Sequence, residues 1–251
     1  MKSIKSNAII AMIHLFFSVA VFGQKSTKTE TNKGFAVLEL FTSEGCNSCP
    51  PADELMGKIQ MEYKDQEVYV IAYHVDYWDH QGWKDIFSKA EYTKRQYDYA
   101  NWFSLPNVYT PQVIINGKQE FVASNETVVR NAIKKILLKP SVANLDLNAT
   151  VSSKKLTVNY TVNSNQKNSN LILTVIQKNA KNAVKRGENA NKILSHFQIV
   201  RHLHTIKLVK NATDKTTISL PDNFNTKDFE VIGFVQNTNT GAIEAVSKII
   251  F

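Results

Sequence analysis

The stretch "VLELFTSEGCNSCPPADELM" (Val37–Met56) holds the only two cysteines of this 251-residue chain. The apolar run "FAVLELFTS" (Phe35–Ser43) ends in turn-forming residues, which is typical of a buried strand. Pro50 and Pro51 suit a first helical turn, so a helix is predicted to begin near Cys49. The two cysteines are therefore expected where a strand gives way to a helix.

Regular elements follow this stretch as far as Pro140. The run "EVYVIAYHV" (Glu67–Val75) predicts a second buried strand, and Ile86–Ala100 predicts a helix. Asn116-Gly117, between two apolar runs, is a strong hairpin signal. A further helix, "ETVVRNAIKKILLK", ends before Pro140. The order β-α-β-α-β-β-α predicts an α/β domain over residues 35–140.

The pattern changes after residue 140. About seven alternating runs without a convincing helix predict an all-β, sandwich-like domain over residues 141–251. One long polar connection, Lys178–His196, interrupts these runs, and connections of that length are often functional. If it folds back on the first domain, it could cover the cysteine site.

The first residues predict a signal peptide. Two lysines precede an apolar run that ends in small residues, so residues 1–23 are expected to be removed on export and residues 24–34 to form a flexible lead-in. A retained membrane anchor is the alternative, but the run is shorter than the roughly 20 residues a spanning helix needs. We therefore expect a periplasmic or secreted protein with no stable membrane insertion after cleavage.

Charge is unevenly distributed. Residues 24–140 carry 14 Lys+Arg against 15 Asp+Glu, a net −1, whereas residues 141–251 carry 14 against 7, a net +7. The basic surplus suits a solvated surface or an acidic envelope partner. Nucleic acid is not expected as a partner, because basic and aromatic residues are not interleaved.

Two cysteines three positions apart allow three interpretations. A disulfide that closes so short a loop contributes only about 2 kcal/mol on the chain-entropy formula, so a structural staple is a poor explanation. A metal site would need further ligands such as His74 and His80, with Asp76 or Asp79, and thiolates with an imidazole would favour copper. Redox exchange needs only two neighbouring thiols at a helix start, and we favour it.

In the redox interpretation Cys46, as the more exposed thiol, is the nucleophile and Cys49 resolves the mixed disulfide. No organic cofactor or metal is needed. "YTPQ" places Thr110-Pro111 before the predicted hairpin, where the order of elements predicts a cis-proline loop lying against the disulfide. Together with that order, the cysteine pair predicts a thioredoxin-like domain.

Several motifs resemble one family. "VLELFTSEGCNSCPPADELM", "HVDYWDHQGWKD", "VYTPQVIING" and "RGENANKILSHFQIVR" are similar to DUF1223, a family of exported bacterial proteins regarded as thioredoxin-like. The resemblance covers essentially the whole chain after residue 23. It implies a thioredoxin-like fold but little about chemistry, because the family has no well-assigned function.

Residues after the second strand are predicted to line the site, since the carboxyl ends of parallel strands share one rim. His74 could tune the thiol or move a proton. Asp76, Trp78 and Tyr109 are expected to contact substrate. Glu39 lies inside an apolar strand and could accept the proton of Cys49, or could instead pair with a lysine or arginine.

The sequence thus predicts an exported thiol–disulfide oxidoreductase of thioredoxin-like type. Its partners would be a protein or small-molecule disulfide or thiol, and an envelope thiol carrier. The alternatives are a copper-binding or metallochaperone protein using Cys46, Cys49 and His74, and a non-catalytic binding module. His202 and His204 would share one strand face and are expected to form a surface stripe.

Overall fold

A computed structural model describes residues 34–164, 168–249 and 251 of the chain. The predicted signal peptide and nearly all of the lead-in lie outside these residues. Within the described ranges, no helix combines the length and apolar character required to cross a membrane.

The first half contains the elements that the sequence predicts, in the predicted order. Their bounds are β1 Ala36–Thr42, α1 Pro50–Glu62, β2 Val68–His74, α2 Ala90–Phe103, β3 Gln112–Ile115, β4 Gln119–Val122 and α3 Glu126–Leu137. Helix α1 begins directly after Cys49, as Pro50 and Pro51 predict. Helix α2 begins four residues later than predicted, because the residues before it form the loop that follows β2.

The second half, where described, contains strands and no helix. Their bounds are β5 Asn144–Ser152, β6 Lys155–Asn163, β7 Ser169–Ala183, β8 Ile193–Lys207, β9 Thr213–Ser219, β10 Phe229–Asn237 and β11 Ile243–Ile249. The predicted boundary at residue 140 falls in the connection between α3 and β5.

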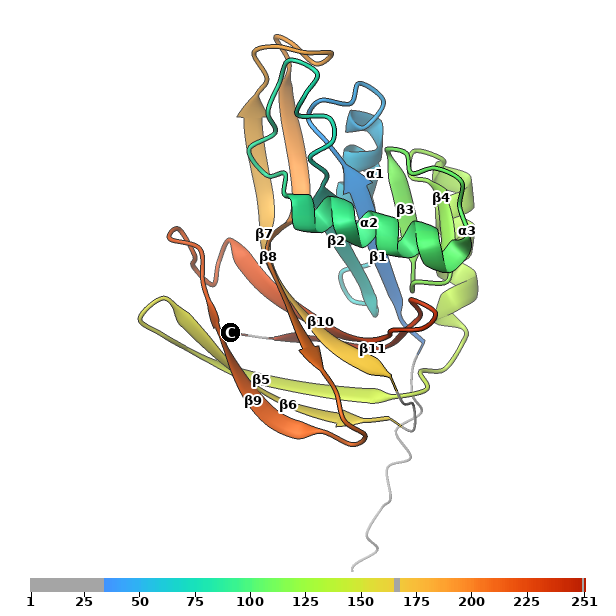
Figure 1. Ribbon diagram of the computed structural model, residues 1–251, viewed down its shortest axis with the longest axis vertical. Coiled ribbons are helices and arrows are strands. Elements are labelled where there is room, and N and C mark those ends of the chain that lie inside the picture. Colours follow the sequence, from blue (N-terminus) through green and yellow to red (C-terminus); the bar gives the residue numbers. More distant parts are fainter. Residues whose placement is uncertain (1–33, 165–167, 250) are drawn as a thin grey trace, which may run out of the picture. The chain divides into compact units, whose positions relative to one another are not determined.

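These strands form two sheets. One is an eight-stranded mixed sheet in the order β11-β10-β7-β8-β2-β1-β3-β4, and the other is a three-stranded sheet in the order β5-β6-β9. Strand β1 pairs parallel with β2 and antiparallel with β3. Within the eight-stranded sheet the two halves are joined by the parallel pairing of β2 with β8, at Ala72 and Ile199 (Figure 1).

The predicted fold class is therefore wrong. A thioredoxin-like α/β domain followed by an all-β sandwich-like domain would keep the two sets of strands apart, but β7, β8, β10 and β11 continue the sheet of β1–β4. The protein is mostly β. Alternating hydrophobicity shows which face of a strand is buried, but it does not show which neighbour pairs with its edge.

Helices cover both faces of the sheet around β1. On one face, α1 and α3 pack on Leu38, Leu40 and Val70. On the other face, the α2 residues Tyr92 and Tyr99 join Phe41 and Tyr73 from the strands. A third core fills the space between the three-stranded sheet and β7, β10 and β11.

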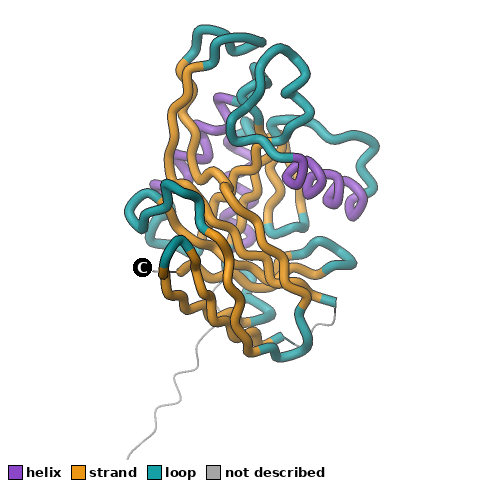
Figure 2. The backbone as a smooth tube through the Cα atoms, turned by 60° about the vertical axis from the view of Figure 1, so that its left-hand side comes forward, coloured by secondary structure: helices purple, strands orange, loops and turns teal. Residues whose placement is uncertain are grey.

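The β7–β8 hairpin carries its tip toward the cysteine segment. Strand β8 crosses α1 where Gly57 leaves room for the Phe197 ring; a Cβ at Gly57 would lie 2.7 Å from that ring. At the tip, Gly187 packs against Trp83 in the loop after β2. Figures 1 and 2 both show the hairpin tip beside this loop.

Candidate functional site

Cys46 and Cys49 form a disulfide at the junction between β1 and α1. The chain turns there through hydrogen bonds from Cys46 N to Ser43 O (3.2 Å) and from Cys49 N to Cys46 O (3.3 Å). Cys49 is the N-cap of α1, and its carbonyl accepts from the first helical amides. The sequence thus predicts the position of the pair correctly.

Both cysteines are buried, and Cys46 is not the more exposed of the two, which differs from the expectation. Cys46 is 0% and Cys49 1% exposed, whereas Asn47 and Ser48 between them are exposed. The Cys46 sulfur lies 3.3 Å from the Ser48 hydroxyl oxygen. The sulfurs therefore lie one layer below the surface.

The β7–β8 connection covers this segment, which confirms that it folds back on the cysteines. The Asn189 amide donates to the carbonyl oxygens of Glu44 and Cys46, at 2.9 Å each. Asn47 N donates to a carboxylate oxygen of Glu188 at 3.0 Å. The connection is shorter than predicted. Strand β7 ends at Ala183 and β8 begins at Ile193, so only residues 184–192 lie between them.

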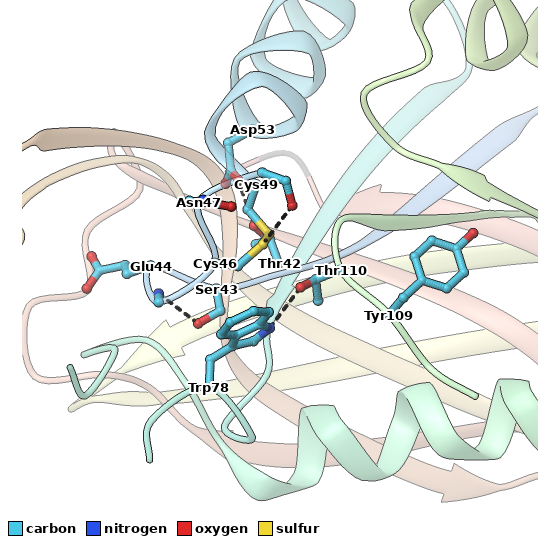
Figure 3. The surroundings of a disulfide bond; sticks show 12 residues. Thr42, Ser43, Glu44, Cys46, Asn47, Cys49, Asp53, Trp78, Tyr109 and Thr110 are labelled. Atoms are coloured by element: carbon cyan, nitrogen blue, oxygen red, sulfur yellow. Dashed lines mark hydrogen bonds between the residues drawn. A yellow bond between two sulfur atoms is a disulfide. The ribbon is translucent and has the colours of Figure 1, made fainter. Parts of the chain in front are cut away.

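A tryptophan joins the cysteine segment to the proline loop. The Thr110–Pro111 peptide bond is cis, as predicted. The Trp78 indole N–H donates to the Thr110 hydroxyl at 2.8 Å, and a Cβ at Gly45 would lie 3.0 Å from Trp78 Cβ. Figure 3 shows Trp78 and Thr110 on one side of the disulfide.

Asp53 and His196 begin a buried polar cluster on the other side of the cysteines. Asp53 lies one helical turn after Cys49 and accepts from the Thr42 hydroxyl at 2.7 Å (Figure 3). His196 lies with Nδ1 3.4 Å from Asp53 Oδ1 and Nε2 3.2 Å from Glu44 Oε1. Burial alone would lower the pKa of His196, but the hydrogen bonds to Asp53 and Glu44 outweigh it and raise the pKa to about 10.

Glu44 is held from several directions. Its carboxylate accepts from the Trp83 indole N–H at 2.8 Å and from the Asn182 amide at 2.9 and 3.0 Å. The side chain is fully buried. The carboxylate therefore has a fixed position two residues before Cys46.

His74 ends β2 in the same cluster. Its Nδ1 lies 2.6 Å from Asp85 Oδ2, which also accepts from Glu44 N at 2.8 Å. Burial alone would raise the pKa of Asp85, but His74 and the backbone donors lower it. The His74 and His196 rings meet edge to face, 4.9 Å apart.

The structure places Glu39 away from the cysteines. Its carboxylate accepts from Arg95 Nε at 2.6 Å and from the Tyr99 hydroxyl, both on α2. Helix α2 covers the face of the sheet opposite α1. Pairing with an arginine, the alternative to a proton acceptor for Cys49, is therefore the arrangement found.

Two predicted contact residues are engaged elsewhere. Asp76 accepts from the Thr93 hydroxyl of α2 at 2.5 Å. The Tyr109 hydroxyl donates to Glu120 of β4, and Figure 3 shows the ring directed away from the disulfide. Of the three predicted contact residues, Trp78 is the one that borders the cysteine segment.

Most residues of the polar cluster were not predicted from the sequence to be functional. Asp53 had a detectable signal, because a residue four positions after Cys49 shares its helix face. Glu44 had a weaker one, as a carboxylate beside a predicted buried strand. Asp85 and His196 had none, since long loops and a non-local strand pairing bring them to the cluster.

The fold and site define a β-rich protein with a buried disulfide at a strand–helix junction, next to a cluster of buried acids and histidines. The chain belongs to the family described as protein of unknown function DUF1223, whose model matches residues 37–236. This confirms the family resemblance, although not the thioredoxin-like and exported character attached to it.

One solved structure shares the fold over most of the chain. The crystal structure of protein AGR_C_4864 from Agrobacterium tumefaciens is similar with a TM-score of 0.67 and 24% identity, covering 86% of this chain and 93% of that one. A domain of the outer membrane lipoprotein Omp28 from Porphyromonas gingivalis matches 43% of this chain and 94% of its own, at 12% identity and a TM-score of 0.29. No curated protein matches the chain.

Proposed function

We propose that the protein is a thiol–disulfide oxidoreductase that works outside the cytoplasm, with Cys46 and Cys49 as its redox pair. The observation that carries the proposal is the disulfide between them, closed over two intervening residues at the start of α1. A helix start favours the thiolate form of a cysteine. Oxidising compartments are where such a pair persists as a disulfide.

The exchange conserves atoms and electrons. Starting from the dithiol, the Cys46 thiolate attacks a substrate disulfide, forms a mixed disulfide and releases one substrate thiolate. The Cys49 thiolate then attacks Cys46 Sγ and releases the second. Two electrons pass to the substrate, and an envelope thiol carrier returns them.

Burial of the sulfurs means that exchange requires local opening. Asn47 and Ser48 are already exposed, and they do not need to move. The groups that cover the cysteine segment are the tip of the β7–β8 hairpin and Trp78, and these would have to be displaced. Local openings of surface loops cost far less than global unfolding. The pair would then react slowly when closed and rapidly when a partner displaces the tip.

The alternatives are less well supported. A copper site of Cys46, Cys49 and His74 would need free thiolates, whereas here the two sulfurs bind each other. A non-catalytic module would leave the disulfide inert. Its reduction potential would then lie below about −300 mV, in the range of structural disulfides.

Trapping tests the proposed function. A Cys49→Ala variant should accumulate a mixed disulfide between Cys46 and its partner, because the resolving thiol is missing. Non-reducing electrophoresis with mass spectrometry would identify the adduct. The Cys46→Ser variant is the control and should trap nothing. Disulfide exchange at the parent rate by Cys46→Ser would overturn the assignment.

The hydrogen bonds that hold the β7–β8 tip over the cysteine segment are expected to slow reduction of the disulfide. Asn189→Ala removes two hydrogen bonds to the cysteine segment, so we expect dithiothreitol to reduce the disulfide about tenfold faster, which corresponds to about 1.4 kcal/mol of opening free energy. Lys185→Ala, an exposed change in the same connection, is the control and should leave the rate unchanged. Equal rates for parent and Asn189→Ala would show that the tip does not limit access.

A further inference from the structure

The two histidines of the buried cluster share one arrangement. One ring nitrogen of each meets a carboxylate: His74 Nδ1 lies 2.6 Å from Asp85 Oδ2, and His196 Nε2 lies 3.2 Å from Glu44 Oε1. A carboxylate on one nitrogen fixes the tautomer of an imidazole and makes the other nitrogen a better ligand. Histidines that bind metals are usually held in this way.

The second ring nitrogens of the two histidines differ in their partners. His74 Nε2 is buried and has no hydrogen-bond partner in the described part of the chain. His196 Nδ1 lies 3.4 Å from Asp53 Oδ1. One ligand atom from each of Asp53, His74 and His196 lies within 4.8 Å of the other two. A buried nitrogen without a hydrogen-bond partner costs free energy, and a ligand bound to His74 Nε2 would remove that cost.

Asp53 is held by its other oxygen. Its Oδ2 accepts from the Thr42 hydroxyl at 2.7 Å, which leaves Oδ1 directed at His196. Asp53 and both histidines therefore each have one polar atom fixed by a neighbour. Of the other three atoms, His74 Nε2 has no partner, and Asp53 Oδ1 and His196 Nδ1 share one hydrogen bond that a metal ion would replace.

The charges of the cluster also favour a cation. Glu44, Asp53 and Asp85 are buried carboxylates, and the two histidines can supply at most two positive charges. Phe87 packs against both imidazole rings, so the neighbourhood includes an apolar wall. Buried charges persist where they are paired or where they bind a metal.

We propose that Asp53, His74 and His196 bind one divalent first-row transition metal ion through Oδ1, Nε2 and Nδ1. Two imidazoles and one carboxylate suit Zn²⁺, which takes such ligands at about 2.0–2.2 Å. Tetrahedral ligands at that distance lie about 3.3 Å apart, so binding would draw the three side chains together by up to about 1.5 Å. A three-residue set leaves a fourth position for water or substrate.

This site differs from the copper site expected from the sequence, because neither cysteine is a ligand. It also does not depend on the proposed redox function. A chain with both cysteines replaced by serine can still bind the metal, and a chain that binds no metal can still exchange disulfides.

Titration of the purified full chain with Zn²⁺ tests the proposal. With the disulfide intact and in the Cys46→Ser, Cys49→Ser double variant, isothermal titration calorimetry should give one Zn²⁺ per chain. His74→Ala should weaken binding at least about 100-fold, and Asp85→Asn should weaken it about 10–100-fold. Co²⁺ should show the visible absorption of a four-coordinate site, which His74→Ala should abolish.

The control variant is His204→Ala. His204 lies on β8 with its ring near His202, outside the cluster, so its replacement should leave the affinity unchanged. Circular dichroism of each variant separates a lost ligand from a lost fold, and His74→Gln replaces His74→Ala if the latter unfolds. Absence of Zn²⁺ binding, or binding that survives both His74 changes, would overturn the proposal.

Discussion

Arg95→Met should lower the free energy of unfolding by about 3–5 kcal/mol. Arg95 is the buried partner of Glu39: its Nε donates to Oε1 at 2.6 Å, and the two side chains are 8% and 0% exposed. Burial alone would lower the pKa of Arg95, but Glu39 raises it above its ordinary value, so the guanidinium stays charged. Methionine would leave the Glu39 carboxylate buried without its counter-ion.

Two further variants isolate this effect. Adding Glu39→Leu to Arg95→Met removes the stranded carboxylate and should recover most of the loss, because apolar replacements of buried pairs are often neutral. Arg130→Met is the matched control: Arg130 pairs with the exposed acids Glu62 and Glu126, so its loss should cost within about 1 kcal/mol. Urea denaturation measures all three. Similar losses for Arg95→Met and Arg130→Met would contradict the argument.

Gly117→Ala should cost about 3 kcal/mol or more of unfolding free energy. Gly117 follows Asn116 in the β3–β4 turn, and both have positive φ, at 60° and 49°. A Cβ at Gly117 would lie 1.9 Å from the carbonyl oxygen of Gly241 in the β10–β11 turn. Alanine would therefore be strained itself and would push the two turns apart. Ile243 N donates to Asn116 O at 2.9 Å across that contact, so the displacement would also disturb this hydrogen bond.

Gly82→Ala separates the cost of placing alanine at a positive φ from the cost of the close contact with Gly241. Gly82 also has positive φ, at 90°, but a Cβ there would meet no atom closer than 3.9 Å. It should therefore cost only the conformational part, about 1–2 kcal/mol. Urea denaturation followed by circular dichroism gives both values. Equal losses at the two positions would mean that the close approach to Gly241 adds nothing.

Local features of this chain could be predicted from the sequence. Short-range patterns give β1, α1, β2, the Asn116-Gly117 hairpin and α3, because each depends on residues within a few positions. The cis bond at Thr110–Pro111 also follows from the order of elements around it. The position of the cysteine pair at the start of α1 could be predicted from the two prolines that follow Cys49.

Features that depend on distant strands could not be predicted. The pairing of Ala72 with Ile199 joins residues 127 positions apart, and the alternation of β8 would suit an edge of either sheet. That pairing decides the fold class, which is why the expectation of a thioredoxin-like α/β fold followed by an all-β sandwich-like fold was wrong. It also brings His196 to Asp53, so the polar cluster was hidden for the same reason. Burial of the sulfurs depends in turn on the β7–β8 tip.

The position of Asn189 along the chain has a consequence for biosynthesis. The cysteine loop is made 143 residues before Asn189, the residue that closes over it. A ribosome adds about 5–20 residues per second, so both thiols emerge roughly 7–29 s before the polypeptide that will shield them. Both thiols are therefore uncovered for that time during synthesis, whereas in the finished protein the β7–β8 tip must open before the disulfide can react.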